Sequence, residues 1–367
     1  MRVVYEGALF PTAGGGPQHF IGLSEGLLAQ GVELVQVLPE GSGVARPAAP
    51  AERVELRASG SRTRRQLRYE FARLVLVLGW WLSGRRVDIW ISRHSIFGVS
   101  LFAARLVARH VVLEVNGPVR EEMLANFGNK PAARLADWLL RAQVRAAHLT
   151  VAVSPGLTNY LKARIPGSRC ETLANGATAS LPSSQERGGS PLLFAGALTP
   201  WYELDVTLRA MSMLRSEGHE LGLRILGDGI RRQEFEDLCK DLGISDLVAF
   251  EGWVDSSTVR AAMQRARVGL LPLRPKHELL DAVGSPLKLY EYVAAGLQVV
   301  GTDVDGVSNS PVSMAVHIYE RSDITSCAHA IRAAMCAPTT TGLGEQAWSW
   351  GARARELFEL LDLPVTA

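Results

Sequence analysis

One short segment, residues 284–296, combines residue types that could bind a nucleotide diphosphate. In it, Ser285 is suited to an N-cap and Pro286 to the first helical turn. The N-terminus of such a helix presents N–H groups and a partial positive charge, which favour a phosphate. Lys288 and Glu291 are three residues apart and share a helix face, so the ammonium could meet the phosphate while the carboxylate binds ribose hydroxyls. A capped surface helix with an ordinary ion pair would show the same pattern.

A glycine-rich loop at residues 11–17 is the second candidate. It follows an apolar, β-branched segment and contains Gly14, Gly15 and Gly16. Glycines let a backbone approach a ligand closely, and a following helix start favours anions. The loop is not a P-loop, because no Gly-Lys-Ser/Thr follows, and a tight turn explains it equally well.

Three further motifs favour a structural interpretation. His19 and the pair Arg93-His94 are isolated, so packing or hydrogen bonding is expected, with an acceptor contact as the alternative. The pair follows a predicted strand end, where ligands gather in parallel sheets. Asp303-Val304-Asp305 resembles a D-x-D metal motif, but it lies between a strand and a glycine, so a turn is favoured. The sequence therefore predicts no metal site and no bound cofactor.

The composition bounds the class of protein. The chain has 367 residues, which favours two domains, with 47% hydrophobic residues, 21% charged residues and a net charge of +2. That small net charge argues against nucleic acid as a partner. The four cysteines are scattered, and the chain shows no leader-like apolar segment at its start and no apolar run of about 18 residues. These features predict a protein of a reducing, cytoplasmic compartment.

The chain alternates apolar β-branched segments with helical periodicity, which indicates parallel sheets covered by helices. The rhythm stops in a polar Ser/Gly/Pro stretch at residues 182–191 and then restarts. We therefore predict an α/β fold of two Rossmann-like, doubly wound parallel-sheet domains. The predicted domains are 1–187, 188–345 and a terminal helix in 346–367, which either covers the second domain or crosses back to the first. The predicted strands are 3–9, 33–38, 87–91, 111–115, 149–153, 192–195, 222–226, 248–250, 268–271 and 299–301.

Residues 62–86 form an unusual segment. Its apolar centre carries Trp80 and Trp81, and arginines flank it on both sides. Apolar runs of about 10–14 residues are usually buried core helices, which would leave the flanking arginines solvated. The alternative is contact with the surface of an anionic membrane, that is, peripheral association with the inner face.

The chain resembles retaining glycosyltransferase family 4, which has the GT-B fold of two Rossmann-like domains facing across a cleft. The resemblance extends over nearly the whole length, because short motifs occur in the family's order and spacing. The motifs are Gly14-Gly15 before the helix 19–31, residues 114–118, 151–154, Asn175-Gly176, residues 194–201, 227–229, 250–253, 285–291 and 296–301.

The resemblance implies a nucleotide-diphosphate sugar, of the UDP or GDP type, as donor on the second domain, and a hydroxyl acceptor, lipid-linked or not, on the first. Glu291 would bind the ribose, and Lys288 and Arg231 would stabilise the departing diphosphate. The implied donor-binding residues are Gly15, Gly16, Gly229, Gly284, Ser285, Pro286, Leu287 and Glu291. Acceptor contacts are expected from His19, Asn116, Arg93 and His94.

Some positions depart from the family pattern. The first of the family's paired glutamates falls at Val283, where Asp281 or Glu278 could substitute. The family's basic residues that bind the diphosphate fall at Ala197 and Tyr202, and Lys288, Arg231 or Arg274 could compensate. These departures favour the alternative of a binding or regulatory subunit that keeps the nucleotide pocket without turnover. A nucleotide-sugar epimerase would instead need acid–base groups that the sequence does not place.

Overall fold

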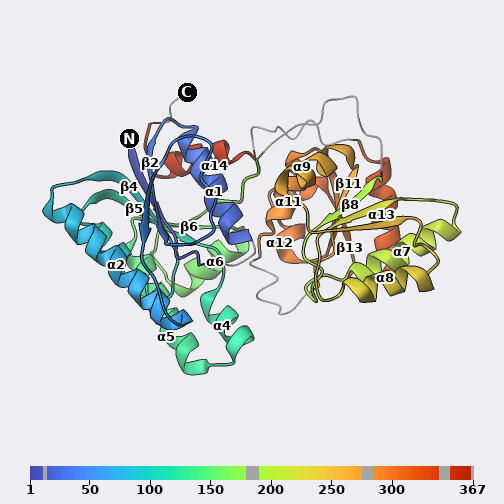
Figure 1. Ribbon diagram of the computed structural model, residues 1–367, viewed down its shortest axis with the longest axis horizontal. Coiled ribbons are helices and arrows are strands. Elements are labelled where there is room, and N and C mark those ends of the chain that lie inside the picture. Colours follow the sequence, from blue (N-terminus) through green and yellow to red (C-terminus); the bar gives the residue numbers. More distant parts are fainter. Residues whose placement is uncertain (11–14, 179–189, 275–283, 339–347, 365–367) are drawn as a thin grey trace. The chain divides into compact units, whose positions relative to one another are not determined.

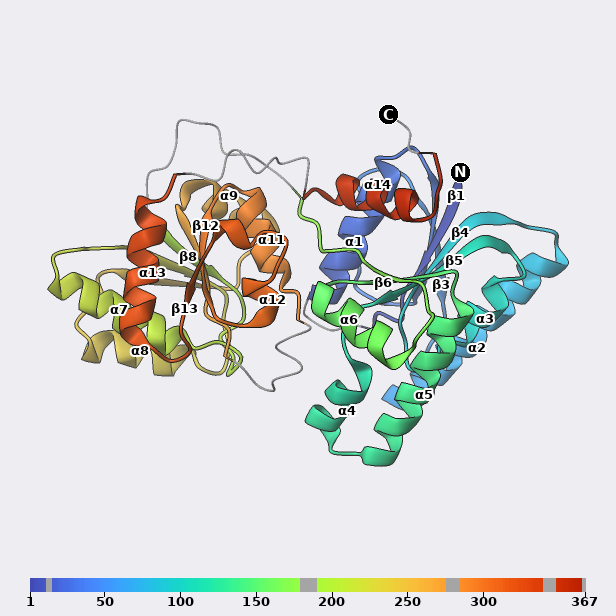
Figure 2. The same ribbon diagram turned by 180° about the vertical axis from the view of Figure 1, so that it is seen from behind.

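The chain folds into two compact units, each built around its own parallel sheet (Figures 1 and 2). The computed structural model describes residues 1–10, 15–178, 190–274, 284–338 and 348–364. The first unit comprises Met1–Gly176, Val283–Ser285 and Trp350–Ala367, and the second comprises Ala177–Ala282 and Pro286–Ser349. The predicted boundary at residue 187 lies outside the described residues.

In the described part of the first unit, seven parallel strands form one sheet in the order β3-β2-β1-β4-β5-β6-β7. Its central strands are buried on both faces, as expected for near-continuous apolar runs. The strands are β1 Arg2–Glu6, β2 Glu33–Pro39, β3 Glu52–Leu56, β4 Val87–Arg93, β5 Ala108–Val115, β6 Leu149–Ala152 and β7 Cys170–Thr172. The helices are α1 Gly15–Leu28, α2 Arg62–Leu82, α3 Val99–Ala104, α4 Val119–Phe127, α5 Lys130–Ala146, α6 Pro155–Arg164 and α14 Trp350–Leu360.

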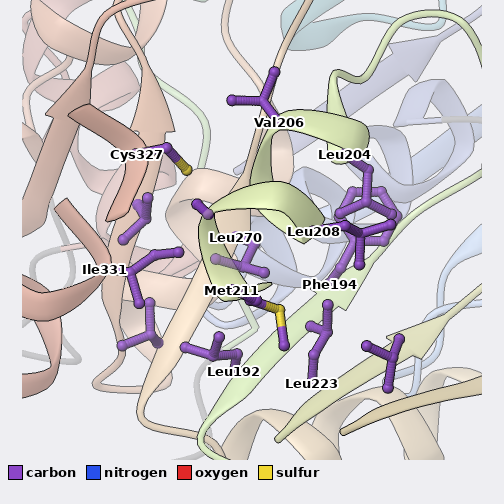
Figure 3. Packing of buried hydrophobic residues seen from close by; sticks show 14 of the residues in the cluster. Leu192, Phe194, Leu204, Val206, Leu208, Met211, Leu223, Leu270, Cys327 and Ile331 are labelled. Carbon is purple, nitrogen blue, oxygen red and sulfur yellow. The ribbon is translucent and has the colours of Figure 1, made fainter. Parts of the chain in front are cut away.

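The second unit repeats this plan, with six parallel strands among its described residues in the order β10-β9-β8-β11-β12-β13. Side chains of β8, β9 and α7 meet those of α13 in its core (Figure 3). The strands are β8 Leu192–Ala195, β9 Leu223–Leu226, β10 Val248–Gly252, β11 Val268–Leu271, β12 Gln298–Thr302 and β13 Val316–Tyr319. The helices are α7 Leu204–Ser216, α8 Arg232–Asp241, α9 Ser256–Arg265, α11 Leu287–Ala294, α12 Asp305–Ser308 and α13 Ile324–Cys336, with a 3-10 turn at Ser313–Ala315.

Both sheets reverse their strand order beside their first strand. The reversal lies between β1 and β4 in the first unit and between β8 and β11 in the second. In open parallel sheets, ligands bind beyond the carboxyl ends of the strands at such a reversal. The structure thus confirms the predicted fold class, and ligand sites are expected beyond the carboxyl ends of the strands at these two reversals.

The helix near the end of the chain, α14, packs against the first helix, α1. A Cβ atom on Gly22 would lie 2.2 Å from Nε1 of Trp350, and one on Gly26 would lie 2.2 Å from the carbonyl oxygen of Trp350. Gly176 also contacts the Trp350 side chain. Because these three glycines have no side chains, they leave the space in which Trp350 is buried.

Helix α2 has two contrasting faces. Its inner face carries Arg73, fully buried, whose guanidinium pairs with Glu70 and lies 3.3 Å from Oε1 of Glu6. Burial lowers the pKa of Arg73, but the two carboxylates outweigh that effect and hold the pKa above its ordinary value.

The outer face of α2 is apolar, because the exposed positions within residues 69–82 are all apolar residues or glycine. Among the described residues, no helix is both long and apolar enough to cross a bilayer.

Candidate functional site

A buried carboxylate, Glu114, gathers side chains at the carboxyl edge of the first sheet. Glu114 lies near the end of β5, directly beside Arg93 at the end of β4. Its Oε1 accepts hydrogen bonds from Nη1 of Arg93 and from Nδ2 of Asn116, each at 2.6 Å. Its Oε2 accepts from the Tyr5 hydroxyl at 2.5 Å. Nε2 of His19 lies 3.2 Å from Oε1.

This environment keeps Glu114 ionised. Burial raises the pKa of its carboxyl group, but the charges of His19 and Arg93 and the hydrogen bonds from His19 and Tyr5 hold it well below the ordinary value. A carboxylate with so many donors is a poor proton acceptor. We therefore assign Glu114 to holding its neighbours in place rather than to acid–base chemistry.

The structure brings together three of the four residues expected to contact an acceptor, because His19, Arg93 and Asn116 all surround Glu114. Nη2 of Arg93 also lies 3.8 Å from the point where a Cβ on Gly16 would stand, so the guanidinium adjoins the first turn of α1. Gly15 begins that helix. Backbone N–H groups and a cation thus lie near each other at this edge.

His94 contacts Glu114 through its backbone, because its N–H donates to the Glu114 carbonyl oxygen at 2.8 Å. Its Nε2 is buried and has no hydrogen-bond partner among the described residues. Burial lowers the pKa of His94 to about 4, with nearby Arg93 acting in the same direction and Glu70 against it. A buried imidazole with such a pKa is neutral near pH 7.

One buried side chain, that of Asn175, connects His19 to Ser285, which lies two residues before the start of α11. Nδ1 of His19 lies 2.8 Å from Oδ1 of Asn175. Nδ2 of Asn175 donates to the carbonyl oxygen of Ser285 at 2.9 Å and to its Oγ at 3.0 Å. Gly284 and Ser285 therefore belong to the first unit, whereas Pro286 begins the next stretch of the second.

In the second unit, loops gather at the carboxyl ends of β8 and β9. Gly227 has φ = +138°, and a Cβ on it would lie 2.0 Å from the carbonyl oxygen of Gly196. A Cβ on Gly229 would lie 2.3 Å from the carbonyl oxygen of Leu198. Glycine is required at both positions, because any side chain would push the two loops apart.

Arg231 holds these loops together. Its guanidinium pairs with Glu234 at 2.5 Å and lies 3.4 Å from Oδ1 of Asp205, and Nη1 donates to the carbonyl oxygen of Tyr202 at 2.9 Å. Hydrogen bonding to Glu234 is the main reason that the pKa of Arg231 is raised. Two carboxylates already neutralise this cation, so its first role is to fix the loop.

Helix α11 carries the pair that the sequence singled out. Nζ of Lys288 lies 2.6 Å from Oε2 of Glu291, and each side chain is about one-third exposed, at 32% and 29%. The predicted N-cap was wrong by one residue: Pro286 is the cap, and Leu287 begins the helix. The Oγ of Ser285 bonds Asn175 instead of capping the helix.

Some predicted residues fall outside the described part of the chain. They are Gly14, Glu278, Asp281 and Val283. The Asp303-Val304-Asp305 motif lies between β12 and α12, with Asp305 as the first residue of α12. Within the described ranges, His, Cys, Asp and Glu side chains form no cluster of three or more that could hold a metal ion.

Sequence reasoning missed Glu114 and Asn175 as members of the site. Glu114 stands in the otherwise apolar run Val111–Val115, and a charge on a buried strand must find a partner. That signal was available in the sequence. Which residues supply the partners depends on the strand order, which brings β5 beside β4.

Comparison with known families covers both units. The family model described as "Glycosyltransferase Family 4" matches residues 13–180, and the one described as "Glycosyl transferases group 1" matches residues 190–336. A GDP-mannose-dependent α-(1-6)-phosphatidylinositol monomannoside mannosyltransferase of Mycolicibacterium smegmatis is 26% identical over 181 residues, which is 45% of this chain and 46% of the relative. Matches to the curated relatives span between 28% and 46% of the relatives' own length.

Two solved structures share the fold over almost the whole chain. Sucrose-phosphate synthase of Thermosynechococcus elongatus is 14% identical, with a TM-score of 0.70 and 98% of both chains covered. HepE of Anabaena, solved in complex with UDP and glucose, is also 14% identical, with a TM-score of 0.68 and 99% of both chains covered. With a family model matched to each unit and this shared architecture, the chain belongs to the family 4 glycosyltransferases of the GT-B fold.

Proposed function

We propose that the protein transfers a sugar from a nucleotide-diphosphate sugar of the UDP or GDP type to a hydroxyl acceptor, with retention of the anomeric configuration. The observation that carries this proposal is the Lys288–Glu291 pair on the first turns of α11, in a chain of this family. A partly exposed ion pair is worth about 0–1 kcal/mol. A phosphate and a ribose can therefore separate the two side chains at little cost.

Two relatives support the donor class. The mycobacterial relative is named for GDP-mannose, and the HepE structure contains UDP and glucose. At the N-terminal end of α11, the backbone of Gly284, Ser285 and Leu287 would meet the diphosphate, beside Pro286. Glu291 would accept hydrogen bonds from the ribose. Gly15, Gly16 and Gly229 offer further places for close backbone approach.

The proposed chemistry needs no protein nucleophile. The bond between the anomeric carbon and the diphosphate oxygen breaks, and the acceptor oxygen bonds to the same face of that carbon. The acceptor proton passes to the departing diphosphate. Lys288 and the N-terminus of α11 stabilise the charge that develops there. Arg231 contributes by holding the loop at residues 198–205, and Asn116 and Arg93 are the proposed acceptor contacts.

A panel of UDP-sugars and GDP-sugars, incubated with and without lipid-linked hydroxyl acceptors, tests this proposal. We expect acceptor-dependent release of one nucleotide, and NMR of the product should show the anomeric configuration of the donor. Nucleotide binding without any turnover would favour the alternative of a binding subunit. The departures from the family pattern at Ala197 and Tyr202 favour the same alternative. A product of inverted configuration would refute retention.

We further propose that residues 62–86 contact the surface of an anionic membrane without crossing it. The exposed residues Leu67, Phe71, Val75, Leu78 and Leu82 are spaced four, four, three and four apart, so they form one stripe on α2. Their exposed fractions are 47%, 67%, 51%, 37% and 78%. Contiguous exposed apolar surface of this kind marks an interaction site.

The charges near both ends of this stripe support an anionic membrane as the partner. Arg64 and Arg68 are exposed around the beginning of the stripe, and Arg86 is exposed after its end. Trp81, 45% exposed, lies at the edge of the stripe. An apolar face with a tryptophan and flanking arginines matches the interface of a bilayer that contains anionic lipid.

Replacing Phe71 and Val75 together by glutamate is expected to abolish sedimentation with phosphatidylglycerol-containing vesicles. Both side chains are already exposed, so the fold should persist. Met314→Glu, at an apolar residue of the second unit that is 74% exposed, is the matched control and should bind like the wild type. Arg64→Gln with Arg68→Gln should weaken binding roughly tenfold or more. Equal sedimentation of all variants would remove this surface from the proposal.

A further inference from the structure

A continuous chain of side-chain contacts runs from Glu114 through His19 and Asn175 to Ser285. The successive distances are 3.2 Å between Glu114 Oε1 and His19 Nε2, 2.8 Å between His19 Nδ1 and Asn175 Oδ1, and 2.9 Å between Asn175 Nδ2 and the carbonyl oxygen of Ser285. All four residues belong to the first unit. Residues distant in sequence thereby converge on the residue before Pro286.

The direction of these hydrogen bonds follows from the chemistry of Ser285. Its carbonyl oxygen can only accept, so the Asn175 group that faces it must be the amide NH₂. The other end of the amide, Oδ1, then faces His19. It follows that Nδ1 of His19 carries a proton and donates it to Asn175.

The chain of contacts is shielded from solvent. The side chains of His19 and Glu114 are 7% and 2% exposed, and Asn175 is 3% exposed as a residue. The indole of Trp350 packs edge-on against the His19 ring, with centroids 5.0 Å apart. Buried polar groups that lose a partner pay the cost of desolvation, so each member strongly restricts the next.

We propose that Asn175 and His19 are positioning residues for donor binding, because they fix Ser285 at the entrance to α11. The inference rests on the proposed function, in which the backbone from Gly284 to Leu287 meets the diphosphate. Ser285 is held at two atoms by one amide, which restrains both its carbonyl and its hydroxyl. A displacement of about 1 Å at such a contact can cost roughly 100-fold in rate.

Two substitutions of Asn175 test this role. Asn175→Asp keeps the size and the acceptor that faces His19, but it places a carboxylate oxygen against the carbonyl of Ser285. Asn175→Ala removes the donor without adding charge. We expect both variants to bind UDP or GDP about tenfold more weakly than the wild type, measured by isothermal titration calorimetry below their unfolding temperatures. His19→Ala should have a smaller effect, since Asn175 keeps its bonds to Ser285.

Asn129→Asp is the matched control. Asn129 caps α5 by accepting a hydrogen bond from the Ala132 N–H at 3.0 Å, and aspartate caps equally well. It adds the same charge to the same unit and should leave nucleotide affinity unchanged. A purely structural role for Asn175 would lower the unfolding temperature while the folded variants bind nucleotide like the wild type, and that result would overturn the inference. A wild-type protein that binds neither UDP nor GDP would instead refute the proposed function.

Discussion

Glu291→Ala is expected to weaken the binding of UDP or GDP roughly 100-fold or more, with little change in stability. A hydrogen bond to a charged group contributes about 1.5–3 kcal/mol, and the proposed role gives this carboxylate two ribose hydroxyls. Its contact within the protein is the partly exposed pair with Lys288, which is worth about 0–1 kcal/mol. Calorimetric titration of the nucleotide and a thermal unfolding curve measure the two quantities.

Glu217→Ala provides the matched comparison in the same unit. Glu217 also pairs with a cation, Arg332 at 3.0 Å, and its side chain is 32% exposed against 29% for Glu291. This control should lose as little stability and no nucleotide affinity. If the Glu291 variant bound both nucleotides as tightly as the control, the ribose assignment would be wrong, and Lys288 would lose its proposed partner in donor recognition.

Arg73→Met is expected to cost about 3–5 kcal/mol of the free energy of unfolding. Arg73 is fully buried between Glu6 and Glu70, which are 0% and 3% exposed. Methionine fills much of the same volume but leaves the two carboxylates buried without their cation. Chemical denaturation measures the change as a shift in the unfolding midpoint.

An exposed arginine, Arg215, is the control that separates the effect of burial from the effect of losing a charge. Arg215 makes a two-pronged contact with Asp246, at 2.6 and 3.0 Å, but its side chain is 32% exposed and that of Asp246 is 61% exposed. Arg215→Met should therefore lower the unfolding midpoint far less than Arg73→Met does. A similarly small loss for Arg73→Met would show that the buried carboxylates take up protons or find other partners.

The fold was predictable from sequence wherever a strand is buried on both faces. Apolar, β-branched runs identified β1, β2, β4, β5 and β6, and all six strands of the second unit except β13. The missed strands are β3, β7 and β13, which pair with only one neighbour at the sheet edges. The sequence of β3, ERVEL, is rich in charged residues because the strand is partly exposed, and β7 has only three residues.

The candidate site was predictable in its parts but not in its connections. Spacing alone placed Lys288 and Glu291 on one helix face, and they do contact each other. The junction at Ser285 was not foreseeable, because its partner Asn175 lies 110 positions earlier in the chain. From its local position the Ser285 hydroxyl was predicted to cap the helix, but it accepts a hydrogen bond from the distant Asn175 side chain instead.

The docking of α14 on α1 has a consequence for synthesis of the protein. Trp350 covers Gly22 and Gly26, yet it leaves the ribosome only after the whole second unit. Until then the growing chain must carry an uncovered face on its first helix, next to His19. The first unit is therefore completed only after residue 350 has been synthesised, and a nascent chain stalled before that residue should be recognised by chaperones that bind exposed apolar surface.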